Sequence, residues 1–311
     1  MRTMAAVLAT LWMLLVSGLG SAVAWNDTGH QVVAIIAWDN VSEQTRKKVV
    51  ATMRAAPSDA RLASMFPSDG RPLAVRQREF FVRASTWPDA IRGDATYDQP
   101  VWHYRDFFWK QENGRVVNLP DAKPDPGELL GQLLRLKGVV ATTDPARARD
   151  RAVGVAWLLH LAGDIHQPLH CSARVTDQEP RGDAGGNTFK LGTFPNSNDR
   201  DNLHRYWDGA VDKAVPRKTN EGTSAHLARA AAAVVNAHPK ASVADRLKPG
   251  QFEEWCRESV AAAQVNAYPV ELKREQNPPG AYRVRVSTVA LERVALGGYR
   301  LAAMLEGLFG Q

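Results

Sequence analysis

The stretch His160-Leu-Ala-Gly-Asp164-Ile-His-Gln-Pro168-Leu-His170 holds the densest group of histidines and aspartates in this 311-residue chain. His160 and Asp164 are four residues apart, so a helix would place both side chains on one face, one turn apart. A single divalent ion can bridge such a pair. Pro168 should end the helix, which lets His170 point in a new direction. The spacing therefore predicts a metal site at the end of a helix.

A second pair with the same spacing, His204 and Asp208, lies further along the chain. One such pair arises readily by chance in a chain with eight histidines, but two pairs on either side of His170 do not. A histidine on an apolar helix is more often a hydrogen-bonded core residue than a ligand, and a nearby aspartate can simply orient it. Leucines beside His160 indicate burial, and a buried carboxylate such as Asp164 needs a strong partner. Metal binding is therefore favoured for the first pair, and both interpretations stay open for the second.

The overall composition describes an ordinary globular chain, with 44% hydrophobic and 23% charged residues. These values exclude disorder, collagen and coiled-coil arrays as descriptions of the whole chain. Two cysteines cannot build a disulfide framework or a cysteine-rich zinc module. The 39 Lys and Arg exceed the 33 Asp and Glu by six, and this small positive excess suits an anionic partner.

The first 24 residues have the features of a secretory signal peptide. Arg2 supplies the positive start, an apolar run follows, and small residues end at Ala24. An uncleaved membrane anchor is the alternative, but the run is shorter than the ~20 residues that span a bilayer. We expect cleavage between Ala24 and Trp25. The product would be a secreted or periplasmic single domain of residues 25–311, with no stable membrane association.

Apolar residues recur at helical spacing through most of the chain, which predicts a mainly α fold. One helix should begin at Thr28 or Gly29, and Ser42 is a typical N-cap for a second that runs to about residue 54. Further helices are predicted over residues 73–87, 126–140, 147–165, 202–214, 223–237, 250–266 and 286–308. Outside the helices we expect a short strand around Trp102–Trp109 and a short β-hairpin over Thr188–Leu191.

Several motifs, taken together, resemble those of a known family. They are Trp25-x4-His30, Trp87-x-Asp89-x-x-Arg92, His103-Tyr104, Gly163-Asp-Ile-His-Gln-Pro-Leu-His170, Gly185-Gly-Asn187 and Asn202-Leu-His204-x-x-Trp207-Asp208. The chain resembles the zinc-dependent single-strand-specific nucleases and 3′-nucleotidases, the S1/P1 nucleases, which are relatives of zinc phospholipase C. This resemblance implies a single-domain, multi-helix phospholipase C/nuclease-like fold.

The resemblance also implies a cluster of three zinc ions (Zn²⁺). The ligands carried over are Asp89, His103, His160 and Asp164 for the first ion; His170, His204 and Asp208 for the second; and the free amine and carbonyl of Trp25, His30 and Asp164 for the third. Imidazole and carboxylate groups suit zinc, and catalytic zinc sites keep a position open for water. Asp164 would bridge the first and third ions.

The activity implied is hydrolysis of single-stranded DNA and RNA to 5′-phosphorylated nucleotides by a zinc-activated hydroxide, together with 3′-nucleotidase activity. Asp164 and Arg92 would be catalytic, with Arg92 on the phosphate. Tyr104 would stack on a base and Asp106 would bond the base edge. Each has a structural alternative: a surface arginine for Arg92, core packing for Tyr104, and a turn for Asp106. A base in a duplex is already stacked and paired, which explains a preference for single strands.

Two other functions remain as alternatives. One is a zinc phospholipase C-like enzyme acting on phospholipid head groups, although that branch tends to end its last ligand pair with Glu rather than the Asp208 found here. The other is an exported zinc-binding protein without catalysis. We expect a monomer, and we read His166 as structural rather than as a ligand. An exported protein permits a Cys171–Cys256 disulfide, but the sequence alone leaves that pairing open.

Overall fold

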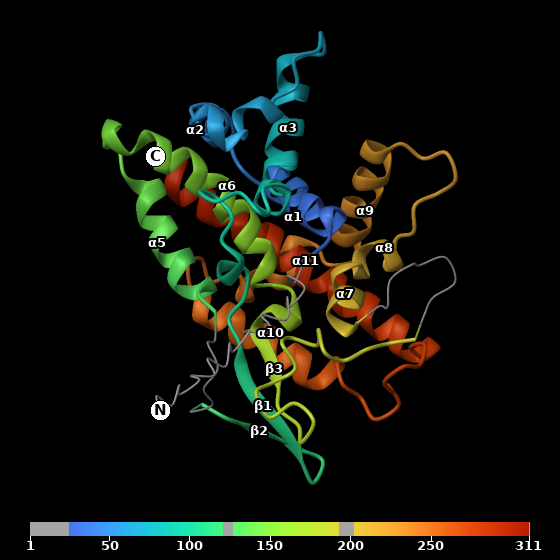
Figure 1. Cartoon of the computed structure of the whole chain (residues 1–311). Helices are drawn as coiled ribbons and strands as arrows, with labels where there is room; N and C mark the ends of the chain where they lie inside the picture. The colour runs from blue at the N-terminus through green and yellow to red at the C-terminus, as the bar shows by residue number, and fades with distance from the viewer. Residues whose placement is uncertain (1–24, 121–126, 193–201, 311) are drawn as a thin grey trace, which may run out of the picture.

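The computed structural model describes residues 25–120, 127–192 and 202–310 (Figure 1). The predicted signal peptide, residues 1–24, therefore lies outside the described residues. The described chain is mainly helical with one small sheet, which confirms the predicted fold class. Among the helices of this part of the chain, none combines the length and apolar character needed to cross a membrane.

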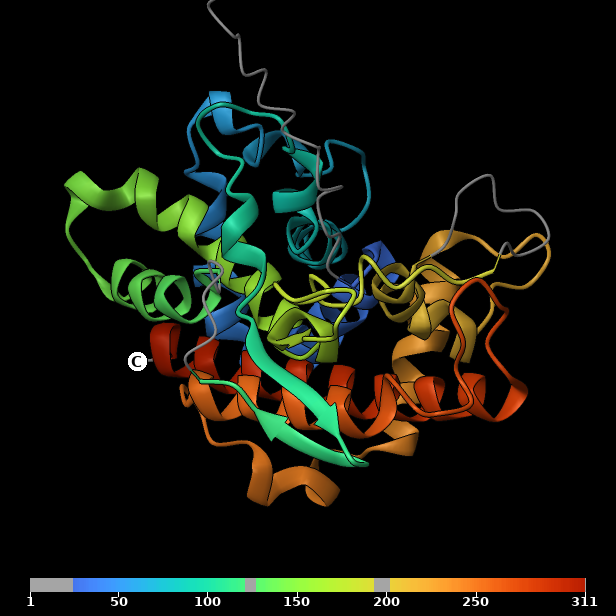
Figure 2. The same cartoon turned by 60° about the horizontal axis from the view of Figure 1, so that its bottom comes forward.

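The centre of the molecule is built from the first and last helices of the described chain. Helix α1 (Asp27–Asp39) is buried on nearly every side, and its core residues include Val32, Val33 and Ile36. Helix α11 (Gly280–Phe309) is 30 residues long and packs along α1. Figures 1 and 2 show α11 running across the whole molecule. Helices buried on all sides read as apolar throughout rather than amphipathic, as α1 does.

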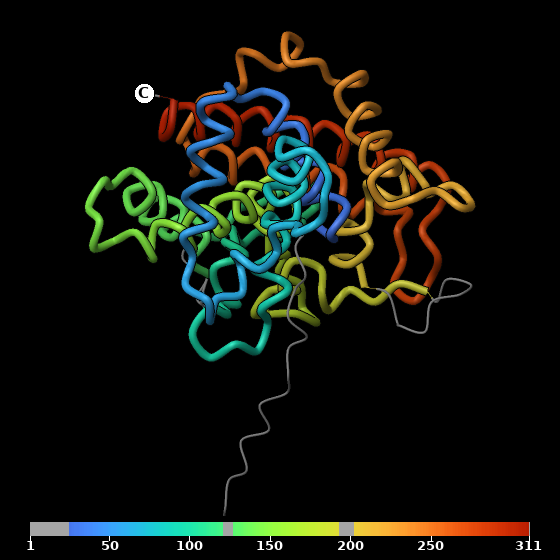
Figure 3. Tube along the Cα trace, turned by 90° about the horizontal axis from the view of Figure 1, so that it is seen from above, coloured from blue at the N-terminus to red at the C-terminus, as the bar shows by residue number. Residues whose placement is uncertain are grey.

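Helix α6 (Ala148–Asp164) packs between the core and α5 (Leu129–Ala141), and it is buried from residue 154 to its end. Helices α2 (Glu43–Arg54) and α3 (Leu73–Ala84) cover the far side of α1 and α6. The side chain of Ser42 accepts a hydrogen bond from the Thr45 amide, so the predicted N-cap of α2 is confirmed. The turn between α5 and α6 and the loop over residues 215–222 project on opposite sides of the molecule (Figure 3).

The remaining helices of the described chain are α4 (Trp87–Ala90), α7 (Leu203–Asp208), α8 (Ala210–Ala214), α9 (Thr223–Ala237) and α10 (Phe252–Asn266), with the short 3-10 segments η3 (Pro100–His103) and η5 (Pro168–Cys171). Of these, α4 and η3 contact α6, whereas α8 and α9 pack on α1 and α11, and α10 packs on η5 and α11. The single helix predicted over 202–214 is divided into α7 and α8 at Gly209. Helix α11 begins at Gly280, six residues before the predicted start, because Pro279 supplies the extended residue before its first turn.

The sheet has three strands in the order β2-β1-β3: β1 (Phe107–Glu112), β2 (Arg115–Asn118) and β3 (Ser172–Arg174). β1 and β2 form an antiparallel hairpin across Asn113-Gly114, and both turn residues have positive φ angles, as a type I′ turn requires. The hairpin expected over Thr188–Leu191 is wrong: in the described residues that segment contributes one isolated bridge, Lys190 with Asn202.

The expected strand at Trp102–Trp109 is right only in its second half, because residues 100–103 form η3. Figure 2 shows the hairpin lying across the C-terminal helices, and the Gln264 side chain of α10 hydrogen-bonds Asn118 at 2.9 Å. Parallel pairing of β1 with β3 places the chain after His103 beside the chain after His170, where the Arg105 amide donates to the His170 carbonyl at 2.8 Å. The sheet therefore brings two predicted ligand segments together.

Candidate metal centre

The ligands predicted from the sequence converge at the C-terminal end of α6. They are His30 on α1, Asp89 on α4, His103 in η3, His160 and Asp164 on α6, His170 in η5, and His204 and Asp208 on α7. All are buried except Asp89, whose side chain is 10% exposed. Within this set, three groups of three have donor atoms close enough to hold a metal ion.

The first two groups surround Asp164. Its Oδ1 lies 3.2 Å from His30 Nε2, and its Oδ2 lies 3.0 Å from His103 Nδ1 and 3.4 Å from His160 Nε2. His160 Nε2 also lies 3.8 Å from Asp89 Oδ1. The donor triplets are His30, Asp89 and His160, and His103, His160 and Asp164, so His160 belongs to both. The two groups are one continuous cluster of nitrogen and carboxylate donors.

The third group consists of His170, His204 and Asp208. The two imidazole Nε2 atoms lie 3.0 Å apart, and His204 Nε2 lies 3.7 Å from Asp208 Oδ1. Asp208 Oδ1 also accepts a hydrogen bond from Gln167 Nε2 at 2.7 Å. Gln167 lies between Asp164 and His170 in the sequence. Its side chain therefore links this ligand-bearing segment to the Asp208 carboxylate and helps to orient that carboxylate.

Backbone carbonyls fix the orientation of the imidazoles. His170 Nδ1 lies 2.6 Å from the His103 carbonyl, His204 Nδ1 lies 2.8 Å from the Gly185 carbonyl, and His160 Nδ1 lies 2.8 Å from the Ser85 carbonyl. A carbonyl only accepts, so each Nδ1 carries the hydrogen and each Nε2 presents a lone pair. This is the arrangement of metal-ligating histidines, whose outer nitrogen donates to a fixed acceptor.

The donor set fits a metal ion on two observations. The facing Nε2 lone pairs of His170 and His204 repel each other unless a cation or a proton lies between them. Burial lowers the pKa of His170 well below its ordinary value, so a proton there is disfavoured. In addition, both ring nitrogens of His30, Asp89 Oδ2 and Asp164 Oδ1 are buried without a hydrogen-bond partner among the described residues. Buried polar atoms without partners are rare, and these four belong to three residues of one donor cluster.

Burial shifts the pKa values of the cluster in opposite directions. It lowers the pKa of His30 well below the ordinary value and that of His103 to about 4. It raises the pKa values of the Asp164 and Asp208 carboxyls well above the ordinary value. The histidines are therefore kept neutral, as ligands must be, and ionised carboxylates in this site require nearby cations.

Two glycines make the close approach possible. A Cβ at Gly163 would lie 2.6 Å from His30 Nδ1, so only glycine lets α6 come this near to α1. Gly185 has φ +62°, and a Cβ there would lie 2.5 Å from the Leu169 carbonyl oxygen. Its left-handed backbone turns the carbonyl toward His204.

Trp25 lies at the edge of the cluster and is fully buried. Its indole nitrogen donates to the Gly163 carbonyl at 3.0 Å, and the next amide, of Asn26, donates to the Asp208 carbonyl at 3.1 Å. The chain around Trp25 is thus held between the ends of α6 and α7, both of which carry ligands.

The residues predicted to contact substrate lie close to the same cluster. Arg92 Nη2 lies 2.6 Å from Asp89 Oδ1, and the Arg92 side chain is 28% exposed. Tyr104 and Asp106 follow η3 directly and are half-buried, and the Tyr104 ring lies against Gly127. Their contacts with a substrate stay predictions.

Sequence reasoning did not find the groups that support the ligands. Gln167 lies inside the quoted stretch and could have been noticed from the motif, whereas the Ser85 and Gly185 carbonyls carry no side-chain signal. The disulfide that the sequence left open is present: Cys171 in η5 is bonded to Cys256 in α10.

A helical domain with a buried cluster of histidines and aspartates is typical of metal-dependent hydrolases, and comparison with known proteins defines which class this is. Residues 25–310 match the family described as S1/P1 Nuclease, so the chain belongs to the S1/P1 nuclease family, whose members are metal-dependent nucleases.

Individual relatives are endonucleases of Arabidopsis thaliana. Endonuclease 4 is 24% identical over 310 residues, covering 96% of this chain and 93% of that protein. Endonuclease 2 is 24% identical over 332 residues, covering 98% of this chain and 96% of that protein. Endonuclease 3 is 26% identical over 208 residues, covering 64% of this chain and 58% of that protein.

Proposed function

We propose that this nuclease is a zinc-dependent endonuclease that hydrolyses single-stranded DNA and RNA to 5′-phosphorylated nucleotides and also acts as a 3′-nucleotidase. The observation that carries the proposal is the pair of facing Nε2 atoms of His170 and His204, which are both oriented by carbonyls to present lone pairs. Family membership supports the nucleic-acid substrate.

Three zinc ions would share the nine predicted ligands. The imidazole and carboxylate donors suit zinc in type and number. The proposed division is Asp89, His103, His160 and Asp164; His170, His204 and Asp208; and Trp25, His30 and Asp164. When bound, zinc would supply Lewis acidity, making water nucleophilic near neutral pH and neutralising charge that builds on the phosphoryl oxygens.

The protein's own residues would then bind and orient the substrate. Asp164, which the proposed division assigns to two ions, would be a ligand of both. Arg92 is partly exposed beside Asp89, a suitable position for a guanidinium that grips a phosphate. Tyr104 would stack on a base and Asp106 would bond its edge, and only an unpaired strand leaves a base available for both.

Export would be part of how this site is completed. Before cleavage the Trp25 nitrogen is an amide and has no lone pair for zinc, so the precursor should be metal-poor. The Cys171–Cys256 disulfide is compatible with a secreted or periplasmic location, because disulfides persist in oxidising compartments. We propose that the mature enzyme is a monomer.

The decisive experiment is product analysis on one short oligonucleotide, single-stranded and in duplex, with and without a chelator. We expect 5′-phosphorylated products from the single strand only, loss of activity with chelator, and recovery with zinc. Metal analysis should give three zinc ions per chain. Phosphatidylcholine is assayed in parallel, and turnover of the lipid alone would contradict the proposal.

A further inference from the structure

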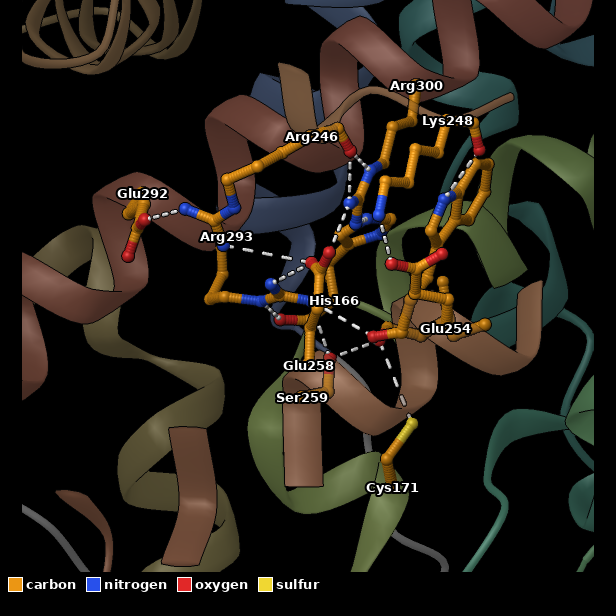
Figure 4. Close-up of polar contacts among 12 residues, drawn as sticks. His166, Cys171, Arg246, Lys248, Glu254, Glu258, Ser259, Glu292, Arg293 and Arg300 are labelled. Carbon is orange, nitrogen blue, oxygen red and sulfur yellow. Dashed lines mark hydrogen bonds and ion pairs between the residues drawn. The ribbon is translucent and has the colours of Figure 1, made fainter. Parts of the chain in front are cut away.

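The segment from Asp164 to His170 connects the donor groups, because Asp164 ends α6 and His170 lies in η5. His166 lies in the middle of this segment and takes no part in the donor groups. Its side chain contacts Ala162 and Arg300 instead. Nδ1 lies 2.7 Å from the Ala162 carbonyl. Nε2 lies 2.9 Å from Arg300 Nη1 (Figure 4). The carbonyl assigns the hydrogen to Nδ1, so Nε2 accepts from the guanidinium.

Two buried arginines of α11 contact this segment at His166. Arg293 and Arg300 are 1% and 0% exposed, and both bind Glu258 of α10, at 2.9 and 2.7 Å. Two guanidinium groups thus share one carboxylate in the core, and burial lowers the pKa of Arg293 to about 10. Buried ion pairs are often no more stabilising than apolar residues of similar size, so stability alone is a poor reason for this arrangement.

The arginines also reach the backbone of the segment. Arg293 Nε donates to the His166 carbonyl at 3.2 Å, and Arg293 Nη2 donates to Ser259 Oγ at 2.7 Å. Ser259 Oγ in turn donates to the Ile165 carbonyl at 2.5 Å (Figure 4). Two consecutive carbonyls directly after Asp164 are therefore held by one network.

Helix α10, which carries Ser259, also fixes the other end of the segment. Cys256 and Ser259 are three residues apart on α10 and so lie on one face of it. Cys256 is bonded to Cys171, next to His170, whereas Ser259 holds Ile165, next to Asp164. One turn of α10 is therefore bonded to both ends of the ligand-bearing segment, by a disulfide at one end and a hydrogen bond at the other.

We propose that Arg293, Arg300 and Glu258 are positioning residues for the metal centre: through His166 and Ser259 they hold the segment so that Asp164 and His170 stand at the separation the metal cluster needs. The inference rests on the proposed zinc function. Residues outside the ligand sphere set metal affinity by fixing ligand orientation, and a segment with free carbonyls would let the donor groups drift.

The test follows zinc release from the purified mature protein to a chromogenic chelator. The first variant is Arg300→Met, which removes the donors to His166 and to the Arg246 carbonyl and one partner of Glu258. The second is Ser259→Ala, which removes the hydroxyl that donates to the Ile165 carbonyl and accepts from Arg293. The control is Glu306→Gln, on the same helix, whose carboxylate accepts from the Thr45 hydroxyl at 3.0 Å and touches no part of the segment. Thermal midpoints are recorded for all four proteins.

We expect Arg300→Met to release zinc about 10-fold faster than wild type, since lost support of this kind costs about 10–100-fold in metal affinity. Ser259→Ala should move in the same direction by less, and Glu306→Gln should match wild type. At saturating zinc, kcat on a single-stranded oligonucleotide should fall in both variants while KM stays unchanged, because neither residue reaches the substrate.

Zinc release from Arg300→Met or Ser259→Ala at the wild-type rate would overturn the positioning role. If Arg300→Met fails to fold, Ser259→Ala alone decides: faster zinc release than wild type supports the positioning role, and release at the wild-type rate overturns it. A wild-type protein that holds no zinc contradicts the proposed function instead. A wild-type protein that holds zinc and cleaves DNA, with variants that behave as the control does, contradicts only the positioning role.

Discussion

The Nε2 atoms of His170 and His204 face each other at 3.0 Å, and each imidazole is turned into this position by a backbone carbonyl. The arrangement commits both rings to presenting lone pairs before any ion arrives. Such preorganisation reduces what binding must spend on ordering side chains.

Replacing the shared carboxylate should abolish activity without unfolding the protein. In Asp164→Asn the side chain keeps its volume but loses the charge that two of the proposed ions share. Supporting residues cost about 10–100-fold when removed, so loss of a direct ligand should lower kcat/KM by more than about 100-fold. Circular dichroism should remain that of the wild type. Asp245→Asn, at an exposed position, is the control, and full activity in Asp164→Asn would refute the bridging role.

Gln167→Ala should weaken zinc binding selectively. The change removes the hydrogen bond that Gln167 Nε2 donates to Asp208 Oδ1 at 2.7 Å, so the carboxylate becomes free to turn. We expect about 10-fold weaker binding of one zinc ion, measured by competition with a chelator. Gln251→Ala changes an exposed glutamine and serves as the control. Equal affinities in the two variants would show that Gln167 does not orient its partner.

Zinc binding should release protons in mildly acidic solution. Burial raises the pKa values of Asp164 and Asp208, so the metal-free protein holds protons on these carboxyls at pH values where an ordinary aspartate has lost them. His103, with its pKa lowered to about 4, is already neutral there and releases none. Titration calorimetry at about pH 5 in buffers of different ionisation enthalpy measures the release. Asp208→Asn should release fewer protons, and proton uptake by the wild type would contradict the prediction.

Blocking the N-terminal amine should remove one zinc site. A mature protein with one extra alanine before Trp25 carries an amide at that nitrogen, which cannot bind zinc. We expect one zinc ion fewer per chain and a large loss of activity, measured by metal analysis and oligonucleotide cleavage. One alanine added after Gln311 is the control. Three ions in the N-terminally extended protein would exclude Trp25 as a ligand through its amine.

Removing the disulfide should destabilise the fold. Cys171 and Cys256 are 85 residues apart, and a crosslink of this length restricts the unfolded chain strongly. The double variant Cys171→Ser/Cys256→Ser should lose about 2–4 kcal/mol of unfolding free energy, measured by urea denaturation. Reduced wild-type protein should unfold at the same urea concentration as the double variant. Unchanged stability in both would show that the bond contributes little.

Local signals made most helices predictable, and long-range contacts account for what was missed. Ser42 caps α2 and the His160–Asp164 spacing falls on α6, since both depend on residues within one turn. The hairpin was placed at the wrong segment, although Asn113-Gly114 carried the turn signal for the real one. The partners of His166 lie 127 and 134 residues away in the sequence, so no local pattern could reveal them.

The packing of α1 against α11 has a consequence for how the protein is made. Because the first described helix is completed by the last one, a growing chain on the ribosome lacks the partner of α1 until residues 280–309 have been synthesised. Arg293 and Arg300, which hold the segment from Asp164 to His170, are part of the same helix and are therefore synthesised equally late. The core around α1 can therefore close only after residues 280–309 have left the ribosome, however early α1 itself emerges.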